Sequence, residues 1–184
     1  LSRLRKHRRC YGESIDERPV DVESRETFGH WEIDTVIGSA DSSEVLLTLD
    51  ERMTRKRHIV KLPAKTAKAV EEGLKQLRKE YGKAWSKVFR TITCDNGSEF
   101  SSLPELFTDT KIYYAHPYSA WERGTNEKQN SLIRRFFPKG KSFTSVSEKA
   151  ISLVEDWINN LPRKFLEYHS PDEVFNSVLF DLAI

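Results

Sequence analysis

The sequence predicts an α/β protein with a central five-stranded mixed sheet and helices on both of its faces. Three short segments that are typical of strands come first, over residues 31–37, 45–49 and 57–62. Segments with helical periodicity then alternate with two more strand-like segments, over 88–94 and 111–115. This order is typical of a sheet that is covered by helices.

The first three strands are expected to form an antiparallel meander, because only short polar turns separate them. Residues 31–37 alternate strictly, which places two sets of side chains on opposite faces of the sheet. These sets are Trp31, Ile33, Thr35 and Ile37 on one face, and Glu32, Asp34 and Val36 on the other.

Four longer helices and one short helix are expected after the meander. Apolar residues recur at steps of three and four over 66–81, and Gly82 is placed to end that helix. A short helix is expected near 103–107, and a longer one over 126–137 that ends at Pro138. Two capping boxes precede the last two helices, at Ser145 with Glu148 and at Ser170 with Glu173. The first of these helices has the apolar stripe Ala150, Leu153, Val154, Trp157, Ile158 and Leu161.

Composition favours one domain. The 184 residues are 38% hydrophobic, which suffices for one sizeable core, and no apolar run is long enough to cross a membrane. The two cysteines, Cys10 and Cys94, do not suit a disulfide framework or a zinc site, so we expect a reducing, cytoplasmic location. Residues 1–28 are expected to form a basic, charged N-terminal arm or linker, and residues 29–184 the folded core. The first nine residues alone carry five Lys or Arg and no acid.

Three acids, Asp34, Asp95 and Glu127, occupy positions that suit a metal site. Asp34 lies within a strand, where an uncompensated carboxylate is costly. Asp95 ends a strand before Asn96-Gly97, and strand ends are where open α/β sheets place their ligands. Glu127 begins a helix. If the three meet, they form an all-oxygen site for hard divalent cations, which suits metal-assisted attack on a phosphodiester.

Each acid also has a simpler explanation. A strand aspartate is often part of an ion pair, Asp95 could be a turn residue, and Glu127 could complement a helix dipole. Asp50 is best explained by turn chemistry at a strand tip. Other acids compete for the same site, namely Glu32, Glu99 and Glu122.

Local charge suggests where DNA would bind. Residues 122–141 hold six Lys or Arg against two acids, whereas residues 142–184 hold three against seven. The basic segment around Glu127 suits phosphates, and the turn over 52–61, with five Lys or Arg, is a second candidate. The proposed DNA-binding residues are Arg123, Lys128, Arg134, Arg135, Lys139 and Lys141.

Several motifs resemble one known family: Trp31-Glu32 with Asp34-Thr35-Val36-Ile37-Gly38, Asp95-Asn96-Gly97-Ser98-Glu99-Phe100, His116-Pro117-Tyr118-Ser119, and Trp121 to Glu127 continuing through Asn130 to Gly140. They are similar to the catalytic core of bacterial insertion-sequence transposases of the IS-thirty type, within the DDE transposase and retroviral integrase superfamily. The resemblance runs from about Glu17 to Phe175. The segment around Glu127 is its most specific part.

The resemblance implies an RNase H-like fold and identifies Asp34, Asp95 and Glu127 as the catalytic, metal-binding triad. It implies two Mg²⁺ or Mn²⁺ ions, cleavage of element ends, and strand transfer into target DNA. It also implies DNA as the partner and a homodimer or higher oligomer in a synaptic complex, with no membrane partner. His30 departs from the small acidic or amide residue that is more usual in the family.

Two alternatives remain open from the sequence. An RNase H-like nuclease with the same fold would hydrolyse DNA without joining strands. A catalytically inactive DNA-binding module would bind DNA without cleaving it.

Overall fold

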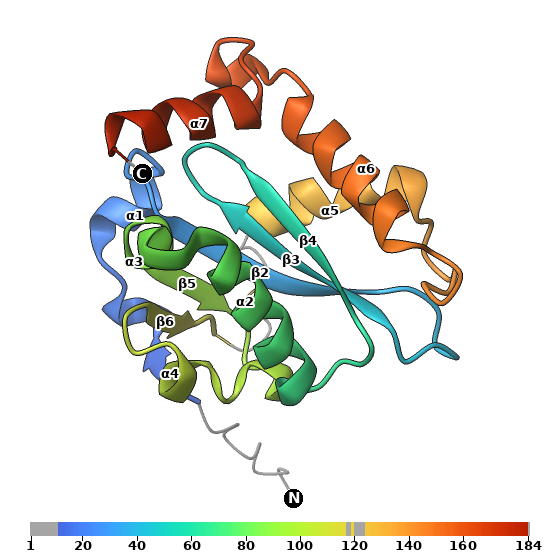
Figure 1. The fold of residues 1–184 in the computed structure, drawn as a ribbon. Helices are drawn as coiled ribbons and strands as arrows, with labels where there is room; N and C mark the ends of the chain where they lie inside the picture. The colour runs from blue at the N-terminus through green and yellow to red at the C-terminus, as the bar shows by residue number, and fades with distance from the viewer. Residues whose placement is uncertain (1–10, 117–118, 120–123, 184) are drawn as a thin grey trace, which may run out of the picture.

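A six-stranded mixed sheet forms the centre of the protein (Figure 1). The computed structural model describes residues 11–116, 119 and 124–183, without the side chains of Glu127 and Lys128. The order across the sheet is β1-β6-β5-β2-β3-β4. The strands are β1 (Glu13–Ser14), β2 (His30–Ile37), β3 (Val45–Glu51), β4 (Arg57–Leu62), β5 (Thr91–Cys94) and β6 (Lys111–Tyr114).

The predicted meander is confirmed, since β2, β3 and β4 pair antiparallel. On the other side of β2, the pairs β2–β5, β5–β6 and β6–β1 are parallel. The prediction of five strands was one short, because β1 has only two residues and two residues show no periodicity in a sequence. β5 is also shorter than the strand predicted over 88–94. Val88 belongs to the helix α3 (Trp85–Val88), and a bend at Arg90 precedes the strand.

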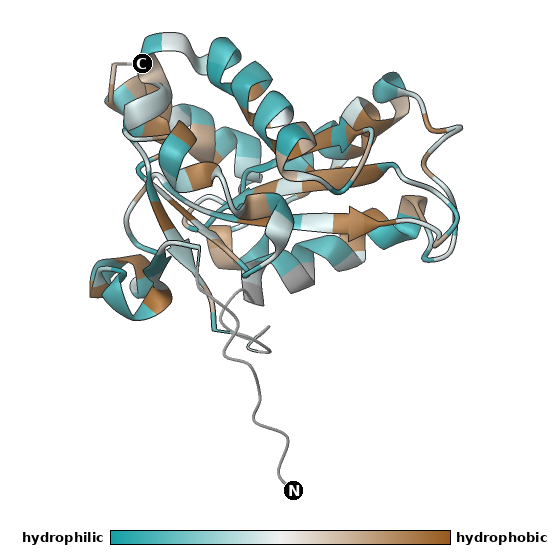
Figure 2. Cartoon of the chain, turned by 90° about the horizontal axis from the view of Figure 1, so that it is seen from below, coloured by the Kyte–Doolittle hydropathy of each residue, from teal (hydrophilic) through white to brown (hydrophobic). Residues whose placement is uncertain are grey.

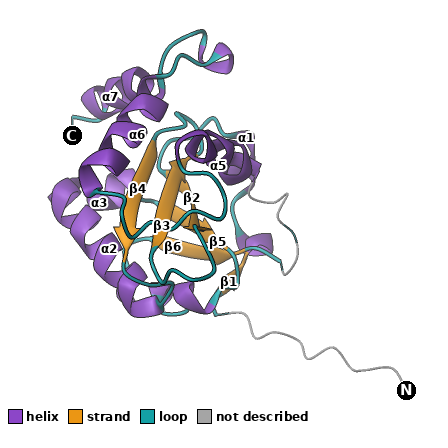
Figure 3. Ribbon diagram, turned by 90° about the vertical axis from the view of Figure 1, so that its right-hand side faces the viewer, coloured by secondary structure: helices purple, strands orange, loops and turns teal. Residues whose placement is uncertain are grey.

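Helices cover both faces of the sheet, and apolar residues concentrate on the strands between them (Figures 2 and 3). The larger core joins one sheet face to α2 (Ala67–Tyr81) and α3, and contains Trp31 and Ile33. The smaller core joins the opposite face to α5 (Gly124–Phe136) and α6 (Glu148–Asn160), and contains Val36. The alternation predicted for residues 31–37 therefore separates the two cores.

The remaining helices are short or peripheral. They are α1 (Val20–Ser24), α4 (Leu103–Leu106) and α7 (Pro171–Asp181), with 3₁₀ turns at Ile15–Glu17 (η1), Gly82–Ala84 (η2), Ser98–Phe100 (η3) and Lys164–Leu166 (η5). None of the helices in the described part of the chain combines the length and apolar character that a membrane span requires.

Two of the predicted helix signals are confirmed at α2 and α7. Gly82 ends α2, and Ser170 with Glu173 forms the expected capping box of α7. The capping box at Ser145 was wrong, because Ser147 is the N-cap of α6.

The stripe predicted for α6 was wrong in part, because two of its larger members lie outside the core. Leu153 is 61% exposed, and Trp157 packs against Phe136 near the surface. The helix buries Ile151, Val154 and Ile158, which also recur at steps of three and four.

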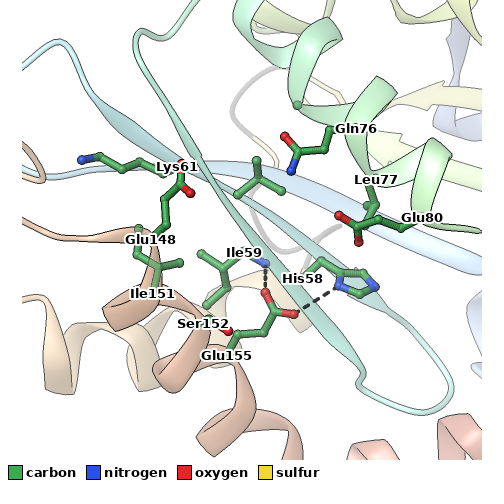
Figure 4. Close-up of a pocket in the computed structure, with 12 residues that line it drawn as sticks. His58, Ile59, Lys61, Gln76, Leu77, Glu80, Glu148, Ile151, Ser152 and Glu155 are labelled. Atoms are coloured by element: carbon green, nitrogen blue, oxygen red, sulfur yellow. Dashed lines mark hydrogen bonds and ion pairs between the residues drawn. The ribbon is translucent and has the colours of Figure 1, made fainter.

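α6 covers the outer edge of β4 and satisfies its backbone. Asn159 accepts a hydrogen bond from the Arg57 N–H and donates one to the Arg57 carbonyl, both of 2.8 Å. One turn earlier, Glu155 accepts from the Ile59 N–H at 2.6 Å and contacts His58 (Figure 4). A strand edge exposes unpaired backbone groups, so these two side chains replace a neighbouring strand. A cavity of about 310 Å³ lies beside them, between β4, α2 and α6.

Residues 11–28, which we expected to belong to an arm, contact the sheet. β1 pairs with β6, and Val22 on α1 is buried. The buried Arg18 donates a hydrogen bond to the Thr93 hydroxyl on β5. Residues 1–10 lie outside the described part of the chain, and the division at residue 28 stays a prediction.

Candidate active site

Two of the predicted site residues lie on or next to two neighbouring parallel strands: Asp34 is within β2, and Asp95 is the first residue after β5. β2 pairs with β5 from His30 opposite Thr91 to Glu32 opposite Thr93. The same offset of 61 residues relates Asp34 to Asp95, two positions further along. Neighbouring strands lie about 4.8 Å apart, and residues at matching positions face the same side. Extended by these two positions, the register directs both carboxylates to one face of the sheet.

Asp34 is half-buried on the face that α5 covers. Its Oδ1 accepts a hydrogen bond from the Thr35 N–H at 2.9 Å. Its Oδ2 accepts one from Nδ2 of Asn130 on α5, at 3.1 Å. These contacts fix the orientation of the carboxylate between strand and helix.

Asp95 is held by the turn that follows its strand. Its Oδ1 accepts a hydrogen bond from the Gly97 N–H at 2.8 Å, and Asn96 donates to the Ala115 carbonyl beyond β6. Gly97 has little free space: a Cβ there would lie 2.8 Å from Oδ1 of Asp95 and 2.6 Å from Cδ of Glu99. A glycine at this position lets the two carboxylates pack against the backbone.

Glu127 lies in the first turn of α5, three residues before Asn130, and its side chain is outside the described part of the structure. The neighbouring Asn126 N–H donates to Oε2 of Glu32 at 3.2 Å, so this end of α5 lies against β2. Among the described residues, no group of three or more His, Cys, Asp or Glu could hold a metal ion. The triad as a set of three therefore stays a prediction.

The competing acids have other partners. The fully buried Glu32 forms an ion pair with Arg52. Glu99 accepts from the Thr35 hydroxyl and pairs with Lys65 at 3.1 Å. Glu122 lies outside the described residues.

Asp50 was wrongly explained by turn chemistry. It lies within β3, fully buried, and accepts two hydrogen bonds from Arg57 at 2.7 and 2.6 Å. Burial raises the pKa of Asp50, and the Arg57 guanidinium opposes that shift. Asp50 and Arg57 are cross-strand partners of β3 and β4, so counting the register of the meander could have found the pair.

Arg57 also links this ion pair to the candidate site. We did not predict this link from the sequence. Arg57 Nη2 donates to Oδ1 of Asn130 at 2.9 Å, while Nδ2 of Asn130 donates to Asp34. A chain of hydrogen bonds thus runs from Asp50 through Arg57 and Asn130 to Asp34. Such a chain fixes which way the Asn130 amide points.

The predicted DNA-binding residues differ in exposure. Arg135, Lys139 and Lys141 are exposed. Arg134 is half-buried and donates to the carbonyl of Ile37 at 2.7 Å, and burial lowers its pKa. Arg123 and the side chain of Lys128 lie outside the described residues.

The second candidate surface, over residues 52–61, was wrong in part. Arg52 and Arg57 are almost completely buried and bind acids inside the protein. They provide no surface for phosphates, because their charge neutralises buried carboxylates.

An open groove of about 530 Å³ adjoins Asp34. Thr35 and Asn130, which both donate hydrogen bonds to the Asp34 carboxylate, line it together with Gly38, Arg134 and Lys139. A strand of nucleic acid in this groove would pass beside the carboxylate.

Comparison with known proteins identifies the family. No family model matches the chain. The transposase for insertion sequence element IS4351 of Bacteroides fragilis is 42% identical over 168 residues, which cover 90% of this chain and 50% of that protein. The transposase InsI for insertion sequence element IS30A of Escherichia coli K12 is 34% identical over 165 residues, which cover 89% of this chain and 42% of that protein. The chain belongs with the insertion-sequence transposases. It spans about half the length of the curated relatives that it matches.

The fold of this chain has a solved counterpart. The catalytic core domain of BIV integrase superposes with a TM-score of 0.64 and 18% identity, covering 86% of this chain and all of that one. The RNase H-like fold expected from the resemblance is confirmed, with β1 as an additional strand.

Proposed function

We propose that this transposase chain is a DDE catalytic core that cleaves the ends of a DNA element and joins them to target DNA. Asp34, Asp95 and Glu127 would be its catalytic, metal-binding residues. The observation that supports the proposal is the parallel pairing of β2 with β5, since Asp34 and Asp95 follow the last paired residues, Glu32 and Thr93, by two positions each. The hydrogen bond from Asn130 supports the third member, because it ties Asp34 to the helix that carries Glu127.

The residues fit Mg²⁺ or Mn²⁺. Both ions prefer oxygen ligands, and carboxylates supply them with charge. When bound, two such ions would activate the attacking oxygen and neutralise charge on the scissile phosphate. The protein would orient its carboxylates in advance through Thr35, Asn130 and the Gly97 N–H.

The reaction balances without an external energy source. In cleavage, the oxygen of water bonds to phosphorus while the bond from phosphorus to the 3′-oxygen breaks, which leaves a free 3′-hydroxyl. In joining, that hydroxyl displaces the 3′-oxygen of a target phosphodiester, so one phosphodiester replaces another. The chain would contribute mainly positioning and charge stabilisation.

DNA is the proposed partner. Lys139 lines the groove beside Asp34, and the exposed Arg135 and Lys141 lie near it in the sequence. Their positive charge suits phosphates. Because joining of two element ends requires both in one complex, we propose a dimer or larger assembly.

The test compares wild-type protein with Asp95→Asn, using Asp181→Asn on α7 as a matched control at an exposed site. Cleavage, strand joining and DNA binding are measured with Mg²⁺ and an element-end duplex. We expect Asp95→Asn to lose cleavage and joining while binding is retained, and the control to behave as wild type. Cleavage without any joined product would favour the hydrolytic nuclease, and binding without cleavage by wild-type protein would favour the inactive module.

A further inference from the structure

A second pocket, lined by three arginines, lies on α5 next to the face that contacts Asp34. It encloses about 450 Å³. Arg25 ends α1, Arg55 lies in the turn between β3 and β4, and Arg163 precedes η5. The lining residues are Arg25, Arg55, Thr125, Gln129, Leu132, Arg163 and Phe165.

Hydrogen bonds hold two of the arginines to α5. Arg55 Nη1 donates to the Thr125 hydroxyl at 3.2 Å, and Gln129 donates back to the Arg55 carbonyl at 2.9 Å. Arg163 Nη2 donates to Oε1 of Gln129 at 3.3 Å and to the Ile158 carbonyl at 3.1 Å. All of these acceptors are neutral oxygens, so they leave the positive charges uncompensated.

Within the described residues, none of the three arginines forms an ion pair. The nearby acids have other partners: Glu32 pairs with Arg52, Asp50 with Arg57, and Glu51 accepts from Thr54. Burial, followed by repulsion from the neighbouring Arg25, lowers the pKa of Arg55 to about 10. Positive charge that is partly withdrawn from water favours a bound anion.

An aromatic ring lies at the same pocket. Phe165 is 60% exposed, and the Arg55 guanidinium lies 4.9 Å from its ring centroid. Exposed aromatic rings beside cationic groups are a common arrangement for single-stranded nucleic acids, in which a base stacks on the ring and the arginines hold the backbone.

The position of the pocket connects it to the candidate active site. Thr125 and Gln129 line the pocket, whereas Asn126 and Asn130, each one residue further along α5, contact Glu32 and Asp34. Successive residues on a helix point about 100° apart, so the two sites occupy adjacent faces of the same two turns. The pocket and the candidate active site are therefore neighbours on α5.

We propose that this three-arginine pocket binds a backbone phosphate of a DNA strand, next to an unpaired base that stacks on Phe165. The inference rests on the proposed function, because it takes DNA as the substrate. It adds a second contact for the strand, separate from the basic residues after α5.

The first experiment measures DNA affinity as a function of salt for the full chain and its variants. Arg25→Gln, Arg55→Gln and Arg163→Gln each remove one positive charge from the pocket, and Arg25 is the exposed arginine of the three. Lys79→Gln removes an exposed positive charge on α2 and is the matched control. Each phosphate contact contributes about 0.7–0.9 to the slope of log affinity against log salt. We expect each pocket variant to lower the slope by about that amount and Lys79→Gln to leave it unchanged.

A second experiment tests the stacked base. Phe165→Leu keeps an apolar side chain at an exposed position and is not expected to disturb folding. It should weaken binding of a single-stranded oligonucleotide about fivefold or more, and leave binding of the same strand with abasic sites unchanged. Equal losses with both strands would contradict stacking.

The outcomes separate this inference from the proposed function. If wild-type protein cleaves DNA and the Arg25, Arg55 and Arg163 variants all keep the wild-type salt slope, the pocket inference is wrong and the catalytic proposal stands. If wild-type protein neither binds nor cleaves DNA, both fail. Thermal melting of every variant shows whether a loss reflects unfolding. Arg25→Gln and Phe165→Leu alter exposed side chains. They therefore still test the inference if the variants of the half-buried Arg55 and Arg163 are unstable.

Discussion

Nδ2 of Asn130 donates a 3.1 Å hydrogen bond to Oδ2 of Asp34, and so joins α5 to the central strand at the candidate active site. The amide cannot turn over without losing this bond, because its oxygen accepts from Arg57. The buried Asp50–Arg57 ion pair thus orients the Asn130 side chain on α5, and Asn130 in turn orients the Asp34 carboxylate. We infer that Asn130 positions Asp34 for metal binding.

Replacing Asn130 should weaken metal use more than folding. We expect Asn130→Ala to raise the Mn²⁺ concentration required for half-maximal cleavage by about 10–100-fold, as is typical when a partner of a metal ligand is removed. DNA binding without metal should not change. Asn160→Ala, at an exposed position of α6, is the matched control. An unchanged metal requirement in Asn130→Ala would show that Asp34 does not depend on this bond.

The Asp50–Arg57 pair should be essential for stability. Both side chains are fully buried, so Asp50→Ala leaves the Arg57 charge without its carboxylate. We expect the free energy of unfolding to fall by about 3–5 kcal/mol in urea denaturation. The double variant Asp50→Leu with Arg57→Met removes both charges and should lose less. A larger loss in the double variant than in the single one would contradict the ion-pair explanation.

Gly97 should matter for activity more than for stability. A methyl group there would displace the carboxylates of Asp95 and Glu99, which are flexible side-chain ends. We therefore expect Gly97→Ala to lower cleavage at least tenfold while the melting temperature changes little. Gly140→Ala provides the comparison: nothing lies near its Cβ position, but its φ of +85° strains an alanine, so it should lose stability rather than cleavage. Full activity of Gly97→Ala would mean that these carboxylates need no fixed position.

His30 should make the protein sensitive to acid. Burial lowers its pKa to about 4, from about 6.5 in an unfolded chain. Between these values the unfolded state binds more protons, so stability falls as the pH drops from 6.5 to 4, by up to about 3 kcal/mol. His30→Asn, which can keep a hydrogen bond to the Thr91 hydroxyl, should flatten this part of the curve. Urea midpoints at pH 7 and pH 5 measure the difference. An identical pH dependence in both proteins would exclude His30 as its source.

The features that could be predicted from the sequence are those that depend on local residue patterns. The alternation of residues 31–37 placed Trp31 and Asp34 on the correct faces, and Ser170 with Glu173 marked the start of α7. Two-residue β1 carries no periodic signal. The start of α6 was misplaced because Ser145 and Ser147 are both residues of the kind that cap helices, and Ser147 is the one that accepts from the Ala150 N–H.

The connections within the site depend on contacts between distant segments. Asp34 and Asp95 were recognisable as strand acids, but their shared position follows from the pairing of β2 with β5. The roles of Arg57 and Asn130 require knowing that α5 crosses the meander, and side-chain chemistry alone made Arg57 a surface cation. The arginine pocket likewise combines three segments that are far apart in the sequence.

The proposed active site requires Asp34, Asp95 and Glu127 together to hold divalent metal. Its most direct test is the anomalous scattering of Mn²⁺ in crystals of the wild-type protein soaked with MnCl₂. We expect an anomalous peak within coordination distance of all three carboxylates, and loss of that peak in Asp95→Asn. A Mn²⁺ peak elsewhere, or three carboxylates too far apart to share ions, would contradict it.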